Sequence, residues 1–300
     1  MARLKQLFQG FILSLILSNT GFADDTATKN IETIKLTDQI YMLMGQGGNI
    51  GVSIGDDGVF LIDDQYAPLN PKIKAAIAKL SDKPIRFMIN THWHFDHTGG
   101  NENLGHDGVI IVAHNNVRER MSKAGFIAAF NKKIPASPKA ALPIITFNDE
   151  ITFHLNNDVI KVAHQSHAHT DGDSIIFFQK SNVIHMGDTF FNGLYPFIDA
   201  SSEGKINGMI RTAKHILNLA DDHTQIIPGH GPLGNKHALQ QFHGMLVSVR
   251  DNMKILIAQG KSIEEIVKLK PNAKLDKVWG NGFLNPEAFL KIVHATMPKQ

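Results

Sequence analysis

The 300-residue chain contains no cysteine. This absence excludes disulfide bonds, a lipid-attachment cysteine, a thiol nucleophile and thiolate metal ligands. The chain also lacks a strong charge of either sign, since 30 Lys and Arg stand against 28 Asp and Glu. A balanced charge disfavours binding to nucleic acid, which requires a basic surface. Any metal site must therefore use histidine nitrogens and carboxylate oxygens.

A second absence is an apolar run long enough to cross a bilayer, which needs about 20 residues. The longest apolar stretch covers residues 7–18 and follows a short basic segment, residues 1–5. Gly21 and Ala23 supply the small residues of a cleavage site. We therefore expect a cleavable signal peptide at residues 1–23, export to the periplasm or the medium, and no membrane anchor afterwards. The alternative is a buried N-terminal helix, but the stretch has no amphipathic pattern.

Residues 24–300 contain no repeat, linker or low-complexity tract, which favours a single domain. Apolar alternation and turn residues predict strands or strand pairs at 39–45, 49–64, 85–92, 108–114, 150–166, 173–188 and 224–231. Helical spacing and capping residues predict helices at 71–81, 115–130, 206–220 and 236–259, and two more that begin after Ser262 and Asn285. Strands mixed with helices in two comparable halves predict two packed sheets with helices outside.

The stretch "THWHFDHTGG" (91–100) carries four residues that commonly bind metals: His92, His94, Asp96 and His97. In an extended segment alternate side chains share a face, so three of the four point one way and His97 points elsewhere. This geometry can give two ligands to one metal and two to a neighbour. Zinc usually takes four ligands, so the rest of the chain must supply the others. The alternative is a solvated, histidine-rich turn.

Three later segments can complete the site. "HAHTDGD" (167–173) follows a predicted strand and offers His167 or His169. "HMGDTFF" (185–191) places Asp188 just beyond an apolar strand, and "IIPGHGPLG" (226–234) places His230 in a turn fixed by Gly and Pro. Each pattern alone is weak, because a strand-end His or Asp is often merely hydrogen-bonded. Together, and in this order, they indicate a metal centre.

The motifs "HWHFDH", "AHTDGD", "GDTFF" and "PGHG" resemble, in order, those of the metallo-β-lactamase-fold hydrolases. The resemblance covers about residues 38–231. It implies an α+β fold, the αββα four-layer sandwich with two mixed sheets, and a metal site at one edge of the sheets.

The same resemblance implies the role of each ligand. It assigns the first metal to His92, His94 and His169, the second metal to Asp96, His97 and His230, and the bridge between them to Asp188. His169 is preferred over His167 because the family ligand directly precedes a Thr-x-x-Asp turn, which here runs from Thr170 to Asp173. Asp63 ends a strand where the family has an Asp, so it is a candidate to orient a metal-bound imidazole; solvation at a strand end is the alternative.

Two metals about 3.5–4 Å apart can hold a bridging hydroxide at neutral pH, and this nucleophile attacks a carbonyl carbon. We expect two zinc ions per chain, with iron or manganese as alternatives for the same donors. Asp96 is the candidate catalytic residue, since it can orient the nucleophile and accept its proton. The predicted enzyme is an exported hydrolase of a small-molecule lactam, lactone, ester or thioester.

The substrate is less well defined. One β-lactamase subclass has a Cys where this chain has Asp188, and a substrate-binding Lys where it has Phe191. Glyoxalase-II-like enzymes carry the bridging Asp but continue with a Cys, a Gly and a basic residue, whereas this chain reads "NGLYPFID" (192–199). Residues expected around the pocket, with packing in the core as the alternative, are Trp93, Phe95, the glycine-rich segment 45–49, Phe191, Asn192 and Tyr195.

Three alternatives remain for the function. The chain can be a β-lactamase of the metallo type as its main activity. It can be a mononuclear iron enzyme of the same fold that uses oxygen, such as a persulfide dioxygenase. It can also be a non-catalytic metal-binding protein, although none of the seven expected ligands is missing. The oligomeric state does not follow from the sequence.

Overall fold

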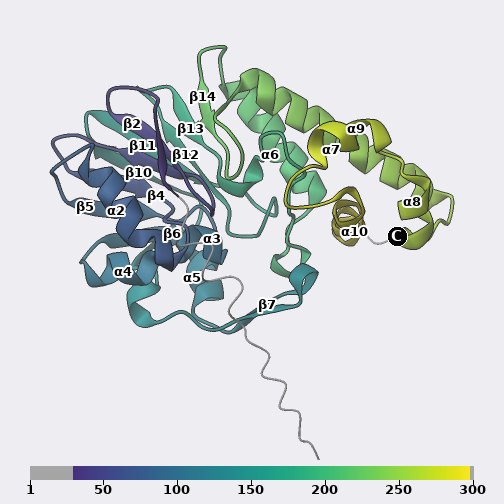
Figure 1. Cartoon of the computed structure of the whole chain (residues 1–300), viewed down its shortest axis with the longest axis horizontal. Helices are drawn as coiled ribbons and strands as arrows, with labels where there is room; N and C mark the ends of the chain where they lie inside the picture. Colours follow the sequence, from purple (N-terminus) through teal and green to yellow (C-terminus); the bar gives the residue numbers. More distant parts are fainter. Residues whose placement is uncertain (1–29, 298–300) are drawn as a thin grey trace, which may run out of the picture.

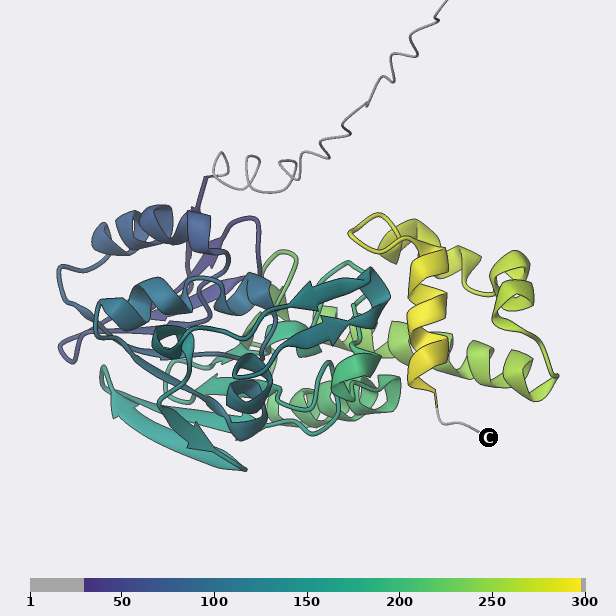
Figure 2. The ribbon, with the colours of Figure 1, turned by 90° about the horizontal axis from the view of Figure 1, so that it is seen from below.

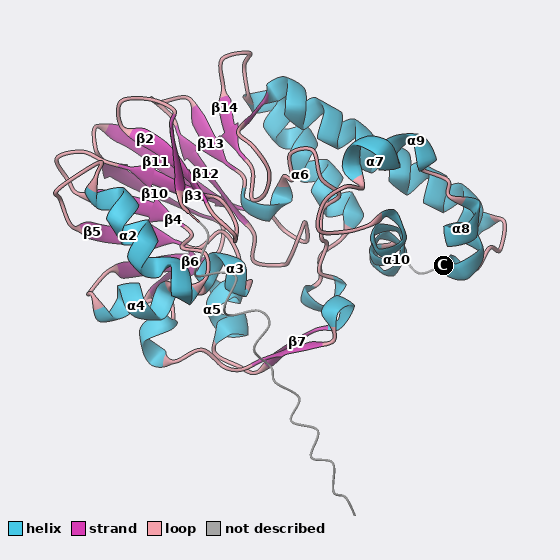
Figure 3. Cartoon of the chain, in the orientation of Figure 1, coloured by secondary structure: helices cyan, strands magenta, loops and turns pink. Residues whose placement is uncertain are grey.

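The computed structural model of the protein describes residues 30–297. The predicted signal peptide lies outside the described residues. Two large β-sheets pack face to face and carry helices on their outer faces, as Figure 1 and Figure 3 show. This is the four-layer αββα arrangement that the sequence motifs predict.

The first sheet has seven strands in the order β1-β2-β3-β4-β5-β6-β9. Strands β1 to β4 pair antiparallel, and β4, β5, β6 and β9 pair parallel. The parallel strands therefore end at the same edge of the sheet. The strands are β1 (Glu32–Lys35), β2 (Ile40–Met44), β3 (Ile50–Ser53), β4 (Val59–Ile62), β5 (Ile85–Ile89), β6 (Ile110–His114) and β9 (Ile145–Phe147).

The second sheet has six strands in the order β10-β11-β12-β13-β14-β15. All its pairs are antiparallel except β13 with β14. A separate two-stranded hairpin pairs β7 with β8. The strands are β10 (Glu150–Leu155), β11 (Asp158–His164), β12 (Ser174–Phe178), β13 (Val183–His185), β14 (Gln225–Ile227), β15 (Gly234–Asn235), β7 (Gly125–Ile127) and β8 (Lys132–Ile134).

Alternation along the strands produces the layers. In β12, Ile176 and Phe178 join the apolar cluster between the sheets, together with Phe60 and Ile89 of the first sheet. The intervening Ile175 belongs to the cluster under the outer helices. Burying one such side chain contributes about 1.5–3 kcal/mol, so the strands need helices on their second face as well.

The helices cover both outer faces and extend the chain beyond the sandwich. Their bounds are α2 (Asn70–Ala78), α3 (Phe95–Thr98), α4 (Asn101–His106), α5 (Asn115–Met121), α6 (Ile206–Leu219), α7 (Lys236–Ala258), α8 (Ile263–Leu269), α9 (Ala273–Trp279) and α10 (Pro286–Thr296). The expected caps are present: Ser262 and Glu265 form a capping box, and the Asn285 side chain accepts a hydrogen bond from the Ala288 N–H. Within residues 30–297, no helix is long and apolar enough to cross a membrane.

One predicted helix is wrong in extent. The segment 115–130 is helical only to Met121, and the chain then forms the β7–β8 hairpin. Phe126 and Ile127 find backbone partners in Lys133 and Lys132 of β8, while Asn131 makes the turn with a φ of 48°. Strand pairing and this left-handed turn residue therefore override the helical spacing of the apolar residues.

Candidate metal centre

The predicted ligands come from loops that follow strand ends. Because β5 lies parallel to its neighbours and β13 lies parallel to β14, the loops after these strands gather at one edge of the sandwich. His92 and His94 follow β5, and α3 carries the next two candidates. The remaining ones are His169 after β11, Asp188 after β13 and His230 after β14.

The expectation that Asp96 shares a face with His92 and His94 is wrong. The chain leaves the extended conformation at Phe95, where α3 begins. Asp96 therefore turns toward His97 and His230, with its Oδ2 atom 3.7 Å and 3.3 Å from their Nε2 atoms. The helical turn therefore separates His92 and His94, which belong to one group, from Asp96 and His97, which belong to the other.

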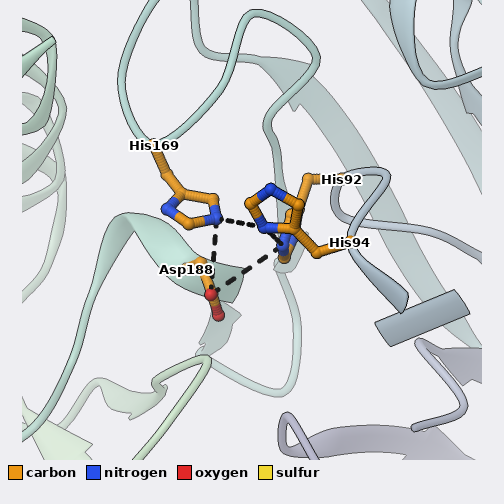
Figure 4. A group of neighbouring side chains, drawn as sticks. All are labelled: His92, His94, His169 and Asp188. Atoms are coloured by element: carbon orange, nitrogen blue, oxygen red, sulfur yellow. Dashed lines mark hydrogen bonds and ion pairs between the residues drawn. The ribbon is translucent and has the colours of Figure 1, made fainter. Parts of the chain in front are cut away.

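The seven residues form two groups of possible metal ligands. The first group is His92, His94, His169 and Asp188, and the second is Asp96, His97 and His230. In each group the ligand atoms lie within 4.8 Å of one another. Figure 4 shows the first group, with the three imidazole rings and the Asp188 carboxylate directed at a common point.

Asp188 lies between the groups. Its Oδ2 atom is 3.8 Å from His92 Nε2 and 3.4 Å from His169 Nε2. Its Oδ1 atom is 3.0 Å from His97 Nε2 and 3.4 Å from His230 Nε2. Oδ1 is buried and has no hydrogen bond of acceptable geometry. One carboxylate thus presents one oxygen to each group.

In the first group, the outward-facing nitrogen of each ring has a hydrogen-bond acceptor. His94 Nε2 lies 3.1 Å from Asp199 Oδ2, and His169 Nδ1 lies 2.8 Å from the Phe197 carbonyl oxygen. His92 Nδ1 lies 3.0 Å from Thr91 Oγ1, whose own proton goes to Asp63. Each ring therefore donates outward, and the inner nitrogen is left with a lone pair.

These inner nitrogens lie so close together that their lone pairs repel one another unless a cation binds between them. His94 Nδ1 is 3.1 Å from His92 Nε2 and 2.8 Å from His169 Nε2. Two lone pairs cannot hydrogen-bond each other, so the arrangement fits a cation that accepts all three. Burial lowers the pKa of His169 to about 4 and also lowers that of His92, which keeps these rings neutral at pH 7, as metal binding requires.

In the second group, the negative charges of Asp96 and Asp188 favour a positive charge beside them. Burial disfavours protonation of His97 and His230, but the negative charges of Asp188 and Asp96 outweigh it. The pKa of His97 is therefore raised well above its usual range, and that of His230 is raised to about 9. A bound cation supplies the same charge in place of the ring protons. The donors of both groups thus fit metal ions.

Asp63 takes the position expected of an orienting carboxylate. Its Oδ2 atom lies 2.7 Å from His97 Nδ1, and its Oδ1 atom accepts a hydrogen bond from the Thr91 N–H. His167 is not part of either group: its backbone has a φ of 50°, and its half-exposed ring faces Glu203 at 3.4 Å. The structure thus places His169, the preferred residue, in the first group.

Asp199 is a functional candidate that the sequence does not reveal. It accepts hydrogen bonds from the hydroxyl of Ser202, at 2.6 Å, and from that of Ser201, while facing His94. In the sequence it looks like a helix cap, and it does also cap a short 3-10 turn. Nothing in "FIDASS" indicates that its second oxygen reaches a residue 105 positions earlier in the chain.

The glycine-rich segment 45–49 lies against the second group. The Gly48 N–H donates to the Asp96 carbonyl oxygen at 3.0 Å, and a Cβ atom at Gly48 would lie 2.0 Å from His97 Cε1. No larger residue fits there without moving the imidazole. The segment therefore holds His97 and Asp96 in place, rather than acting only as a cover.

The expected aromatic lining is partly present. Phe191 stacks on His230 with the ring centres 5.0 Å apart, and Phe95 is half-buried beside Tyr66. For two residues the alternative of packing in the core holds. Trp93 donates to Ser202 and packs in the core while its ring centre lies 5.1 Å from that of His94, and Tyr195 donates to Asp276 of α9.

One expected residue and one that the sequence analysis missed also lie near the centre. Asn192 is bound to the Pro232 carbonyl oxygen at 2.9 Å and holds the loop of His230. Phe197, which the sequence did not single out, lies 5.6 Å from the ring of His94 and 5.7 Å from that of His169. One side of the first group is therefore apolar.

The centre opens to solvent on one side. The side chains of His230 and Asp96 are 25% and 19% exposed, whereas Asp188 and the other four histidines are 5% exposed or less. A small molecule therefore reaches the centre past the second group.

Comparison with known proteins identifies the class of protein that this fold and centre define. Residues 44–240 match the model of the metallo-beta-lactamase superfamily. The match spans more than half of the chain, so the chain belongs to this superfamily. The resemblance that the four motifs indicate is thereby confirmed.

Individual relatives are distant. The chain is 22% identical over 178 residues to the 2,4-dinitroanisole O-demethylase subunit alpha of Nocardioides sp. (strain JS1661). The aligned region covers 59% of this chain and 50% of that protein. The chain is 25% identical over 122 residues to the hydroxyacylglutathione hydrolase of Pelagibacter ubique, covering 40% and 43%. It thus spans about half the length of these relatives or less. A probable hydroxyacylglutathione hydrolase, glo2 of Schizosaccharomyces pombe, is 26% identical over 200 residues, covering 64% and 67%.

Solved structures share the fold at low identity. The DIM-1 metallo-beta-lactamase superposes with a TM-score of 0.57 at 20% identity, over 72% of this chain and 97% of that one. A metallo-beta-lactamase from Pontibacter korlensis gives a TM-score of 0.58 at 16% identity, over 72% and 99%. A double mutant of the sec-alkyl sulfatase PisA1 gives 0.65 at 15% identity, over 88% and 50%. These likenesses support the αββα fold.

The contact between Asp199 and His94 leads to a testable prediction. Asp199→Asn keeps the size of the side chain but removes the charge that orients and polarises the imidazole. We expect the zinc dissociation constant of the first group to rise about 10–100-fold. Competition with a chromogenic chelator at neutral pH measures it.

Asp158→Asn is the matched control. Asp158 is also buried, but it binds backbone N–H groups at the other end of β11. If Asp199→Asn and Asp158→Asn bind zinc equally well, Asp199 does not orient a ligand.

Proposed function

We propose that the protein is a hydrolase that uses two zinc ions to cleave an acyl bond in a small molecule. The acyl bond is that of a lactam, lactone, ester or thioester. The observation that carries this proposal is the position of Asp188, whose two oxygens face two separate sets of imidazole nitrogens. A mononuclear site needs no such shared carboxylate.

In this proposal each of the seven residues belongs to one of two metal sites. His92, His94 and His169 would hold one ion, and Asp96, His97 and His230 would hold the other, with Asp188 shared. When bound, such a pair supplies a hydroxide nucleophile at neutral pH and polarises the carbonyl under attack. Zinc suits this set of imidazoles and carboxylates, while iron and manganese accept the same donors.

The protein's own groups position the reactants. Asp96 is partly exposed, and its Oδ2 atom lies at the open side of the centre, 3.3 Å from His230. Its pKa is lowered to about 2, because the charges of His97 and His230 outweigh the effect of burial, so it stays ionised and can orient a water molecule by accepting a hydrogen bond from it. Phe191 and Phe197 exclude water from the sides of the centre.

The relatives support acyl or ester substrates without selecting one. Hydroxyacylglutathione hydrolases and metallo-beta-lactamases occur among the similar proteins, together with an O-demethylase subunit and a sec-alkyl sulfatase. β-Lactam cleavage as the main activity is the first alternative. The second is a mononuclear iron enzyme that uses oxygen, and metal analysis giving about one iron per chain would establish it.

The central prediction concerns Asp188. The wild-type protein should bind about two zinc ions per chain and hydrolyse at least one member of a panel of nitrocefin, lactones and thioesters, with phosphodiesters as the disfavoured class. Asp188→Asn should bind about one zinc and lose turnover about 100-fold or more, because the shared ligand is gone. Elemental analysis and initial rates measure the two effects.

His167→Gln serves as the control, since His167 lies beside the ligand loop but outside both groups. It should leave zinc content and turnover unchanged. An Asp188→Asn protein with two zinc ions and normal rates would show that the shared carboxylate is not needed.

We also propose that the protein is exported and cleaved after Ala23. The support is the apolar stretch 7–18 between a basic start and small residues at the cleavage position. Expression of the full chain in a bacterium should yield periplasmic protein whose first residue by Edman sequencing is Asp24. Cytoplasmic protein that retains residues 1–23 would refute export.

A further inference from the structure

Lys132 contacts Phe95 beside the solvent-exposed second group of ligand candidates. It begins β8 of the β7–β8 hairpin, which Figure 2 shows reaching from the sandwich toward the C-terminal helices. Its Nζ atom is 3.4 Å from the centre of the Phe95 ring. Phe95 directly precedes Asp96, one of the two ligand candidates exposed to solvent. The hairpin thus brings an ammonium group to the entrance of the centre.

The ammonium group has no anionic partner within residues 30–297, where Lys132 makes no salt bridge. The face of Phe95 attracts the cation but accepts no conventional hydrogen bond, so the three N–H donors stay available. Burial lowers the pKa of Lys132, while the charge of Asp96 raises it. Lys132 is exposed, so its ammonium group is accessible to an anion that approaches from solvent.

The same hairpin contributes an apolar surface. Phe130, in the connection between β7 and β8, packs on Phe197 at a ring-centre distance of 4.6 Å and on Phe283 at 5.3 Å. Phe197 in turn borders His94 and His169. An aromatic wall therefore runs from the first group of ligands to the hairpin, while Lys132 stands at the second group.

The segment between Asp188 and Asp199 contains no positively charged side chain. Phe191, three residues after Asp188, is stacked on His230, and the next charged residue along the chain is Asp199, which faces His94. A negatively charged substrate must therefore find its cation elsewhere, and Lys132 is placed to provide it.

We propose that Lys132 determines specificity by binding the carboxylate of the substrate, while the aromatic wall receives an apolar acyl group. The substrate class is an apolar or aryl acyl group joined through a labile acyl bond to a part that bears a carboxylate. This inference rests on the proposed hydrolytic function. Lys132 acts in binding and stays out of the bond-breaking step.

A pair of thioesters tests the proposal through turnover. S-phenylacetyl thioglycolate carries a carboxylate, and S-phenylacetyl thioglycolamide is its neutral analogue. The released thiol is measured with Ellman's reagent, and a chain without cysteine adds no thiol background. In the zinc-loaded protein, Lys132→Met should raise KM for the carboxylate substrate about 10-fold, because one charge-assisted hydrogen bond is lost. KM for the amide substrate and kcat for both substrates should stay nearly unchanged.

Two variants complete this test. Lys132→Arg should restore KM to within about 3-fold, since it keeps the charge. Lys133→Met is the matched control, because successive residues of a strand point to opposite faces. Equal KM values for the carboxylate substrate in Lys132→Met and Lys133→Met would overturn the role of Lys132 while leaving the hydrolase intact.

A binding measurement separates this inference from the proposed function. Isothermal titration of zinc-loaded protein with phenylacetylglycine and with phenylacetylglycinamide reads the same contact without turnover. Lys132→Met should raise the dissociation constant of phenylacetylglycine about 10-fold and leave that of phenylacetylglycinamide unchanged. If no member of the panel of nitrocefin, lactones and thioesters is hydrolysed but binding of the acid alone depends on Lys132, the hydrolase proposal fails and the anion site stands. If the affinity for the acid does not depend on Lys132, the anion site fails.

Discussion

The structure of the centre depends on one electrostatic constraint: in the first group, buried imidazole lone pairs converge without protons between them, beside the carboxylate of Asp188. His94 Nδ1 and His169 Nε2 lie 2.8 Å apart although both rings donate their proton outward. Asp188 adds a buried oxygen without a hydrogen bond. Such a cluster is unfavourable in a low-dielectric interior unless positive charge compensates it. Metal ions would relieve both the repulsion and the unpaired oxygen.

The fold meets this constraint by fixing the outer partners of the ligands. Asp63 directly follows β4 and uses both oxygens, on Thr91 and His97. Its backbone φ of 63° is unusual for a residue other than glycine, and such strain persists where the surroundings over-determine the geometry. Asp199 does the same for His94 from the other half of the chain. The two sheets therefore each supply a carboxylate that orients a ligand contributed by the first sheet's loops.

Strand alternation and helical spacing predict the layers and most of the elements, because these are local patterns. The seven residues that converge follow from the family resemblance, since the strand-end motifs alone leave His167 and His169 as alternatives. Prediction from the sequence fails where tertiary contacts decide the outcome. The turn into α3 moves Asp96 away from His92, and strand pairing converts the end of a predicted helix into the β7–β8 hairpin. Asp199 and Lys132 reach the centre through contacts across the fold, and neither residue stands in a motif that distinguishes it from a cap or an exposed lysine.

The proposed dinuclear centre depends most directly on Asp188 lying between two ions. Anomalous diffraction at the zinc absorption edge from crystals of the zinc-loaded protein tests this without reference to any substrate. We expect two anomalous peaks about 3.5–4 Å apart, one beside His92, His94 and His169 and the other beside Asp96, His97 and His230, with one oxygen of Asp188 on each. A single peak at full zinc loading, or two peaks with Asp188 bound to neither, would contradict it.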